Sequence, residues 1–157
     1  MIVGMLAVAS LILVVGLILF ISWLFNSYNR YKLYCLLGSK TAWMAWIPFN
    51  PIPTYGMVRA VYPGGLFGLS SSAIMGIAIV GVAVNATVIP YIGVFAGFIG
   101  TICCLAMWIL YIKCVVDLCE ENGAEPVVPI LVYVLVPLVG TGISCIILRN
   151  TLSRCAY

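Results

Sequence analysis

The sequence contains no histidine, and its four acidic residues all fall within residues 117–125. Histidine is the commonest general base and a very common metal ligand, so its absence removes the usual means of proton transfer and metal binding. None of the seven cysteines forms a Cys-x-x-Cys pair, the usual spacing in a zinc site. We therefore predict no catalytic residue, no metal ligand and no bound cofactor, and we expect that the protein is not an enzyme.

Charge is also scarce, because 7% of the residues are charged while 65% are hydrophobic and the mean hydropathy is +1.25. These values lie far outside the range of soluble globular domains. Residues 1–29, 60–112 and 126–148 carry no charge at all. The composition predicts a membrane protein whose crossing segments lie in these three stretches.

The first stretch contains one predicted span, residues 2–25. A helix of this length crosses a hydrocarbon core of about 30 Å. The segment has no basic residue before its apolar run and no small-residue cleavage site, so we expect it to remain attached rather than to be removed as a signal peptide.

The other two stretches supply three more predicted spans. The second fits residues 66–84 and 90–113 with a turn at 85–90, because an asparagine is costly in the bilayer and a proline is tolerated in the first turn of a helix. The third stretch fits one span, residues 127–148. The predicted fold is a single all-α membrane domain, residues 1–157, with about four transmembrane helices.

The distribution of Lys and Arg predicts the orientation. Four crossings place both termini on one side, with five cations on the opposite face and only Arg149 and Arg154 beside the C-terminus. By the positive-inside rule, the long first connection is cytoplasmic and the termini lie outside. A fourth segment broken at Pro137 and residues 140–142 would instead return the two arginines to the cytoplasm.

The first connection has two predicted parts. Residues 29–47 are predicted to form an amphipathic helix on the membrane surface, and the tryptophans at its end suit the headgroup level. The prolines that follow are expected to prevent this helix from continuing and to force a turn. This segment is either a lipid anchor or a platform for a partner, and the residues concerned are Lys40, Trp43, Trp46, Pro48, Asn50, Pro51 and Pro53.

Small residues form stripes on the predicted second and third spans. Such stripes allow helices to approach closely in a membrane. On the second span, Ala78 and Gly81 form an alternative to the stripe that begins at Ser72. The helices pack through these residues either within one bundle or against another protein, and the predicted interface comprises Ser72, Gly76, Gly93, Gly97 and Gly100.

Residues 31–55 read YKLYCLLGSKTAWMAWIPFNPIPTY. This segment resembles a block in small, mostly uncharacterised bacterial multi-pass membrane proteins, where a basic amphipathic helix ends in Gly-x-Lys and is followed by Trp-x-Ala-x-Ile-Pro and an asparagine. The resemblance implies a bacterial cytoplasmic membrane. The matching residues are Gly38, Lys40, Trp43, Ala45, Ile47, Pro48 and Asn50.

Two functions remain open. The first is an accessory or scaffold subunit of a larger membrane assembly, or a homo-oligomer, with the lipid bilayer and other membrane subunits or further copies as partners and no nucleic acid. The second is a small channel or permease in which a broken fourth helix exposes backbone carbonyls to a polar path. The residues of that broken helix are Pro137, Gly140, Thr141 and Gly142.

Overall fold

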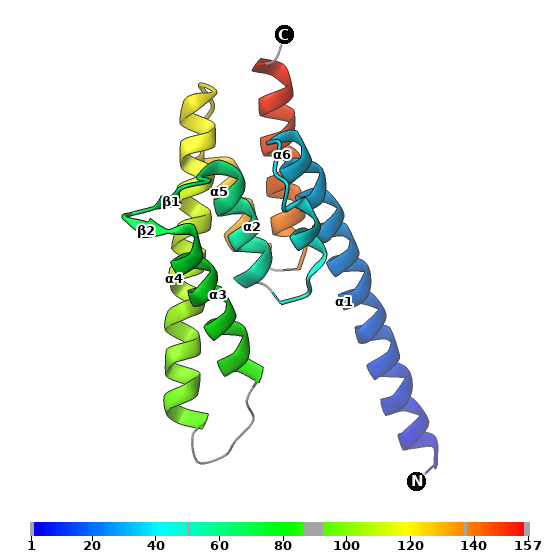
Figure 1. Cartoon of the computed structure of the whole chain (residues 1–157). Helices are drawn as coiled ribbons and strands as arrows, with labels where there is room; N and C mark the ends of the chain where they lie inside the picture. The colour runs from blue at the N-terminus through cyan, green and yellow to red at the C-terminus, as the bar shows by residue number, and fades with distance from the viewer. Residues whose placement is uncertain (1, 50, 87–92, 137, 156–157) are drawn as a thin grey trace.

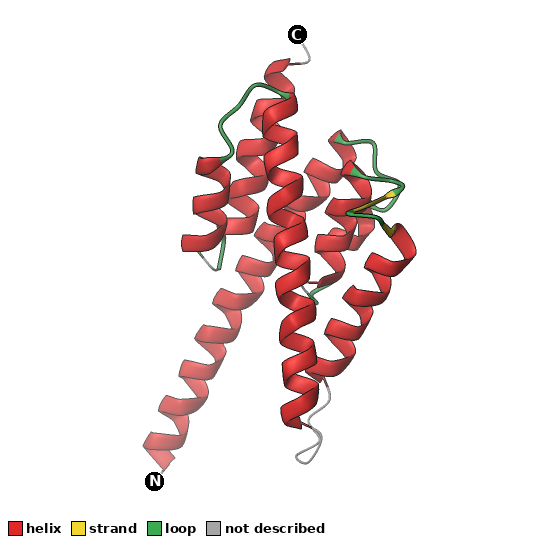
Figure 2. Ribbon diagram, turned by 90° about the vertical axis from the view of Figure 1, so that its left-hand side faces the viewer, coloured by secondary structure: helices red, strands yellow, loops and turns green. Residues whose placement is uncertain are grey.

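The computed structural model describes residues 2–49, 51–86, 93–136 and 138–155, which are helical almost throughout (Figures 1 and 2). The predicted all-helical class is confirmed. The two short strands pair antiparallel, with Gly65 opposite Ser70. In chain order the elements are α1 (Ile2–Leu36), the 3-10 helix η1 (Ala42–Trp46), α2 (Pro51–Val61), β1 (Gly65–Leu66), β2 (Leu69–Ser70), α3 (Ser71–Ala86), α4 (Gly93–Glu121), α5 (Val127–Leu135) and α6 (Gly140–Cys155).

The first helix, α1, is longer than predicted. It continues from the predicted span at residues 2–25 into the segment expected to lie separately on the membrane surface at residues 29–47. No proline or glycine occurs over the several turns before Gly38, so nothing in the local sequence ends the helix earlier. The prediction of a separate interfacial helix at residues 29–47 is therefore wrong, because residues 29–36 form the last turns of α1.

After α1 the chain turns back and then returns (Figure 1). The 3-10 helix η1 packs against α1, and α2 runs back toward the end of the molecule where α1 finishes. We call η1 and α2 the first hairpin. A new helix, α2, begins at these prolines: Pro51 is its first residue and Pro53 lies in its first turn. Proline is tolerated there because the first N–H groups of a helix have no intrahelical acceptor.

The second charge-free stretch forms α3 and α4, which pack against each other in antiparallel directions (Figure 1). They occupy the regions predicted as spans at 66–84 and 90–113, and α4 continues beyond the predicted end to Glu121. Within the predicted turn at 85–90, residues 87–90 lie outside the described residues.

The predicted fourth span, residues 127–148, is divided into α5 and α6, which pack against each other as a second hairpin. A continuous fourth helix is therefore wrong, and the structure has the alternative, broken form. Gly140 is required at the turn, because a Cβ on this residue would collide with the carbonyl oxygen of Val132. Pro137 lies outside the described residues.

The two halves of the chain share one plan: a long helix, a glycine cap and a fold-back hairpin. In the caps, Gly38 and Gly123 have φ values of 70° and 63°. The N–H of the residue after each glycine donates to a carbonyl five residues earlier, at 2.9 Å for Ser39 and 2.8 Å for Ala124. The packing is reciprocal, because α2 lies on α4 and α6 lies on α1. Each hairpin therefore joins the long helix of the other half.

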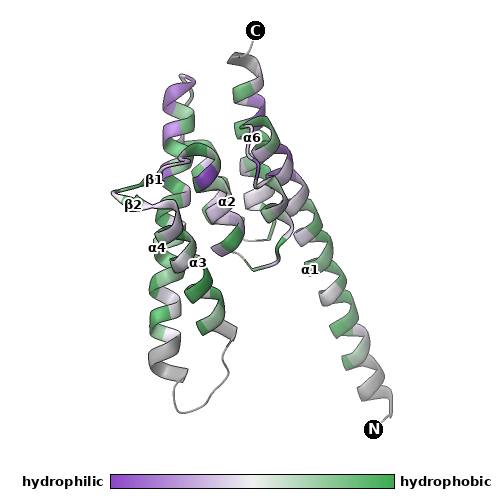
Figure 3. Ribbon diagram, viewed as in Figure 1, coloured by the Kyte–Doolittle hydropathy of each residue, from purple (hydrophilic) through white to green (hydrophobic). Residues whose placement is uncertain are grey.

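All eleven charged residues gather toward one end of the molecule, which we call the charged end (Figure 3). They lie in the C-terminal halves of α1, α2, α4 and α6 or in the turns after α1 and α4, and these four helices all run toward that end. α1 begins at the opposite end from that at which α6 finishes (Figure 1). This placement differs from the predicted one, in which both ends of the chain share one side, because the second hairpin turns back on itself.

Two helices are long and apolar enough to cross a membrane, Val8–Leu36 within α1 and Gly97–Glu121 within α4. The apolar part of α3, Ser71–Val84, is shorter, so the four predicted crossings are not confirmed. The first part of α1 diverges from α3 and α4 (Figures 1 and 2), and every side chain of residues 8–21 is exposed. Among the described residues of α1, the buried side chains begin at Ser22, in its second part.

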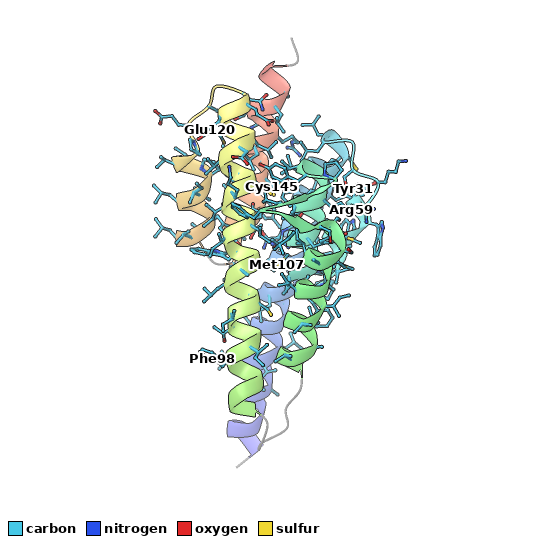
Figure 4. All side chains as sticks on the ribbon, turned by 60° about the vertical axis from the view of Figure 1, so that its left-hand side comes forward. Tyr31, Arg59, Phe98, Met107, Glu120 and Cys145 are labelled. Atoms are coloured by element: carbon cyan, nitrogen blue, oxygen red, sulfur yellow. The ribbon has the colours of Figure 1, made fainter. Side chains whose placement is uncertain are left out.

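The buried core lies where the two hairpins meet the second halves of α1 and α4. In Figure 4, Met107 and Cys145 lie at the centre of this region, and both are 2% exposed or less. Helices α6 and α1 approach closely at Gly142, where a Cβ would lie 2.6 Å from a ring carbon of Phe25. This glycine allows the first turn of α6 to rest directly on α1.

The close approach at Gly142 predicts that an alanine there destabilises the protein, whereas an alanine at Gly76 does not. We expect Gly142→Ala to lower the free energy of unfolding by about 1–3 kcal/mol, because the new methyl group overlaps Phe25. The control is Gly76→Ala on α3, where nothing lies within 4 Å of the new Cβ and stability is expected to rise by about 0.5 kcal/mol. Thermal unfolding of the purified variants, followed by tryptophan fluorescence, checks this, and equal melting temperatures would contradict the packing.

Candidate functional site: a polar cavity between the two hairpins

A cavity of about 220 Å³ lies where one face of α1 meets the turns of both hairpins, and we call it the central cavity. Its wall is half polar, although the helices around it are strongly apolar. The lining residues are Leu19, Ser22, Trp23, Asn26, Arg30, Ile47, Pro48, Leu138 and Thr141.

Asn26 joins α1 to both sides of the turn between α5 and α6. Its Nδ2 donates to the carbonyl oxygen of Leu138 at 2.6 Å, and its Oδ1 accepts from the N–H of Gly142 at 2.7 Å. An asparagine amide offers both a donor and an acceptor, so one side chain satisfies a carbonyl before α6 and an N–H in its first turn. The cavity wall therefore depends on this one amide.

Arg30 supplies a positive charge to the wall of the central cavity. Its side chain is only 9% exposed, and it lies one helical turn beyond Asn26 on α1. Burying a guanidinium is costly unless polar groups surround it. No carboxylate lines the cavity, since the acidic residues lie at the end of α4 and in the turn after it.

The first turn of α6 adds a second positive contribution. Thr141 lines the cavity, and this end of the helix carries a partial positive charge, although the N–H groups of Gly140, Gly142 and Ile143 already have acceptors within the protein. Together with Arg30, the helix end makes the cavity attractive to an anion or to the negative end of a polar solute.

A layer of polar aromatic groups lies within electrostatic range of Arg30. It comprises Tyr34, Tyr111, Tyr133 and the thiol of Cys145. The rings of Tyr111 and Tyr133 lie with centroids 4.4 Å apart, and the Tyr111 hydroxyl is 3.9 Å from the sulfur of Cys145. Tyr34 donates a hydrogen bond of 2.6 Å to the carbonyl of Pro53. These groups fix the hairpins around the buried charge.

The predicted surface platform is divided between the interior and the surface. Trp46 packs against Trp23 and Tyr31 of α1, with ring centroids 6.4 and 6.3 Å apart, yet it is still 38% exposed, and Trp43 is 58% exposed. Its prolines have three different places: Pro48 lines the central cavity, Pro51 is half-buried and Pro53 is buried. Lys40 is exposed, and Asn50 lies outside the described residues.

The predicted glycine interface is also divided. Ser72 and Gly76 are exposed on α3, and a Cβ at Gly97 would meet nothing within 4 Å. Gly100 is buried, and Gly93 is the first residue of α4. The contact between α3 and α4 uses the other stripe, because a Cβ on Gly81 would lie 3.2 Å from the Cβ of Cys103.

The broken-helix residues are brought to the central cavity. Thr141 lies in its wall, and Gly140 and Gly142 shape the turn beside it. Among the described residues, no group of three His, Cys, Asp or Glu side chains could hold a metal ion.

The polar residues of α1 are functional candidates that the sequence analysis missed. The predicted first span ends at residue 25, and Arg30 falls in the segment predicted to lie on the membrane surface. The signal was present, because Ser22, Asn26 and Arg30 recur every four residues and so share one helix face. A helix that continues to Leu36 places that face inside the protein.

The two hydrogen bonds that Asn26 makes on either side of the turn between α5 and α6 predict that Asn26→Ala destabilises the protein more than Asn29→Ala does. We expect Asn26→Ala to lower the free energy of unfolding by about 2–3 kcal/mol, because it leaves a carbonyl and an N–H without partners. We also expect alkylation of the buried Cys145 to accelerate, since α6 is released from α1. The control is Asn29→Ala, because the Nδ2 of Asn29 donates to the carbonyl oxygen of Phe25 within the same helix. Unchanged protection of Cys145 in Asn26→Ala, measured by mass spectrometry, would contradict this role.

Comparison of the chain with protein-family models, with curated proteins and with solved structures gives no match.

Proposed function

We propose that this is a multi-pass protein of a bacterial cytoplasmic membrane and that the central cavity binds a small polar or anionic solute, as in a channel or permease. The observation that carries the proposal is the meeting of two hairpin turns with Asn26 and Arg30 around one cavity. The source and the membrane follow from the resemblance of residues 31–55 to bacterial membrane proteins.

The membrane setting is supported by exposed apolar surface. The most apolar window of the first crossing helix is only 6% buried, whereas the core helix of a soluble protein is covered by its neighbours. The seven cations all lie toward the charged end, which the positive-inside rule assigns to the cytoplasm. The proposed orientation has the first turns of α1 outside and the end of α6 inside.

The two hairpins favour a permease over a purely structural subunit. Irregular backbone at membrane depth is tolerated where it is covered by protein or lines a polar cavity. Transporters place their substrate sites at such breaks, where helix ends and freed backbone groups face the substrate. Here the lining offers no acid or histidine, so it suits binding and passage better than proton transfer.

Association is the second candidate function, and the bare surface of α1 supports it. Every side chain of residues 8–21 is exposed, and a Cβ added at Gly76 or at Gly97 would meet nothing within 4 Å, which leaves room for another helix. An accessory subunit or a homo-oligomer would cover this surface with another membrane protein or a second copy. The two candidates are compatible, because an oligomer of permeases uses both surfaces.

Flux through liposomes that contain only this protein tests the first candidate. We expect uptake of chloride, followed with a trapped chloride-sensitive dye, or of glycerol, followed by light scattering, to exceed that of protein-free liposomes. Thr141→Val should reduce it about threefold to tenfold, because the hydroxyl in the cavity wall is lost.

The control for this flux is Thr151→Val, which removes a hydroxyl that bonds to Ile147 further along α6. It should leave the rate unchanged. Folded protein that carries neither solute would contradict the permease and leave association as the function.

A further inference from the structure

A second cavity, of about 280 Å³, lies at the charged end between the turn after α1 and the last turn of α2. We call it the interfacial pocket. It shares no residue with the central cavity. Its lining residues are Leu37, Gly38, Ser39, Lys40, Thr41, Arg59, Ala60 and Pro63.

Two cations line this pocket from different elements. Lys40 comes from the turn after α1 and Arg59 from α2, and both side chains are exposed. The Nη1 of Arg59 donates to the hydroxyl of Tyr55 at 3.3 Å, and that hydroxyl lies 3.1 Å from the Oγ of Ser71. This contact orients the guanidinium, which has five N–H donors in all, and so leaves most of them available to a ligand.

The opposite wall of the pocket is a rigid turn that carries two hydroxyls. Gly38 has a φ of 70°, and the bond from the Ser39 N–H to Tyr34 fixes the direction of the chain. The Oγ of Ser39 lies 3.0 Å from the hydroxyl of Thr41 and accepts from the Thr41 N–H at 3.2 Å. Small hydroxyl groups in a fixed turn are therefore placed beside the two charges.

The pocket has no negative charge of its own. No carboxylate lines it, and Asp117 forms an ion pair with Lys113 within α4. Figure 4 places Glu120 and Arg59 on opposite sides of the bundle. A ligand that enters the pocket therefore meets two positive charges without competition from an acidic side chain nearby.

We propose that the interfacial pocket binds a phosphate group, carried by the headgroup of an anionic lipid. Arginine and lysine together with hydroxyl donors are the usual recognition set for phosphate. Basic pockets on the cytoplasmic side of membrane proteins recognise anionic headgroups. The exposed Trp43, two residues beyond the pocket, suits the same headgroup level.

Lipid adducts on the intact protein, counted by native mass spectrometry, test this proposal. The purified chain is titrated with phosphatidic acid, with phosphatidylglycerol and with zwitterionic phosphatidylcholine. We expect the anionic lipids to bind and the double variant Lys40→Gln/Arg59→Gln to weaken their binding about 25-fold, since each cation near a membrane surface is worth about a factor of five.

The matched control is the double variant Lys32→Gln/Arg149→Gln. It removes the same net charge from the charged end, but neither residue lines the pocket. Binding should remain within about twofold of the unmodified protein. An equal loss of lipid binding in both double variants would overturn the proposal, because the lipid would then be attracted by the overall charge. No loss of binding in Lys40→Gln/Arg59→Gln would also overturn it, because the two cations of the pocket would then not bind the lipid.

Competition with millimolar inorganic phosphate distinguishes the two possible sources of the ligand. Retention of the lipid adducts supports a headgroup held by its phosphate and its neighbouring lipid surface. Displacement that is lost in Lys40→Gln/Arg59→Gln supports recognition of the phosphate alone, as from a soluble phosphate ester. Displacement that persists in that variant would overturn the assignment to this pocket.

Discussion

The amide of Asn26 is the interaction on which the architecture most depends. It bonds to two backbone groups that lie 112 and 116 residues away in the sequence, on either side of the turn between α5 and α6. Because both bonds form only when the second hairpin lies against α1, the amide selects the folded-back form over a continuous helix. Gly142 makes this possible, since any side chain there would overlap Phe25. The central cavity exists because this turn is held in place.

The reciprocal packing of the halves explains why a small chain can bury polar groups. Each hairpin lies on the long helix of the other half, so the buried region is enclosed by α1, α2, α4 and α6. Arg30 lies there among tyrosines and backbone dipoles, which lower the cost of burying its charge. The same arrangement directs all the charged ends of the helices one way. The reciprocal packing of the two halves therefore accounts both for the buried polar groups and for the location of the charged residues at one end.

Composition and patterning predict the all-helical class and the location of α3 and α4, because these depend on local apolar runs. The sequence also contained the broken fourth segment as an alternative, through Pro137 and the glycines after it. The continuity of α1 was missed, because the change from apolar to charged residues suggested an exit from the membrane although no helix breaker was present. The shared helix face of Ser22, Asn26 and Arg30 could be predicted from their spacing, but the burial of Arg30 could not, since it depends on two hairpins folding back against residues distant in the sequence.

The location of the two termini tests the central claim that the second hairpin replaces a fourth crossing. Short epitope tags at the N-terminus and at the C-terminus are probed with a protease in sealed membrane vesicles of known orientation. The account predicts that the tags lie on opposite sides, with the C-terminal tag on the side of the charged end. Two tags on the same side would contradict the fold-back of α5 and α6 and would support four full crossings instead.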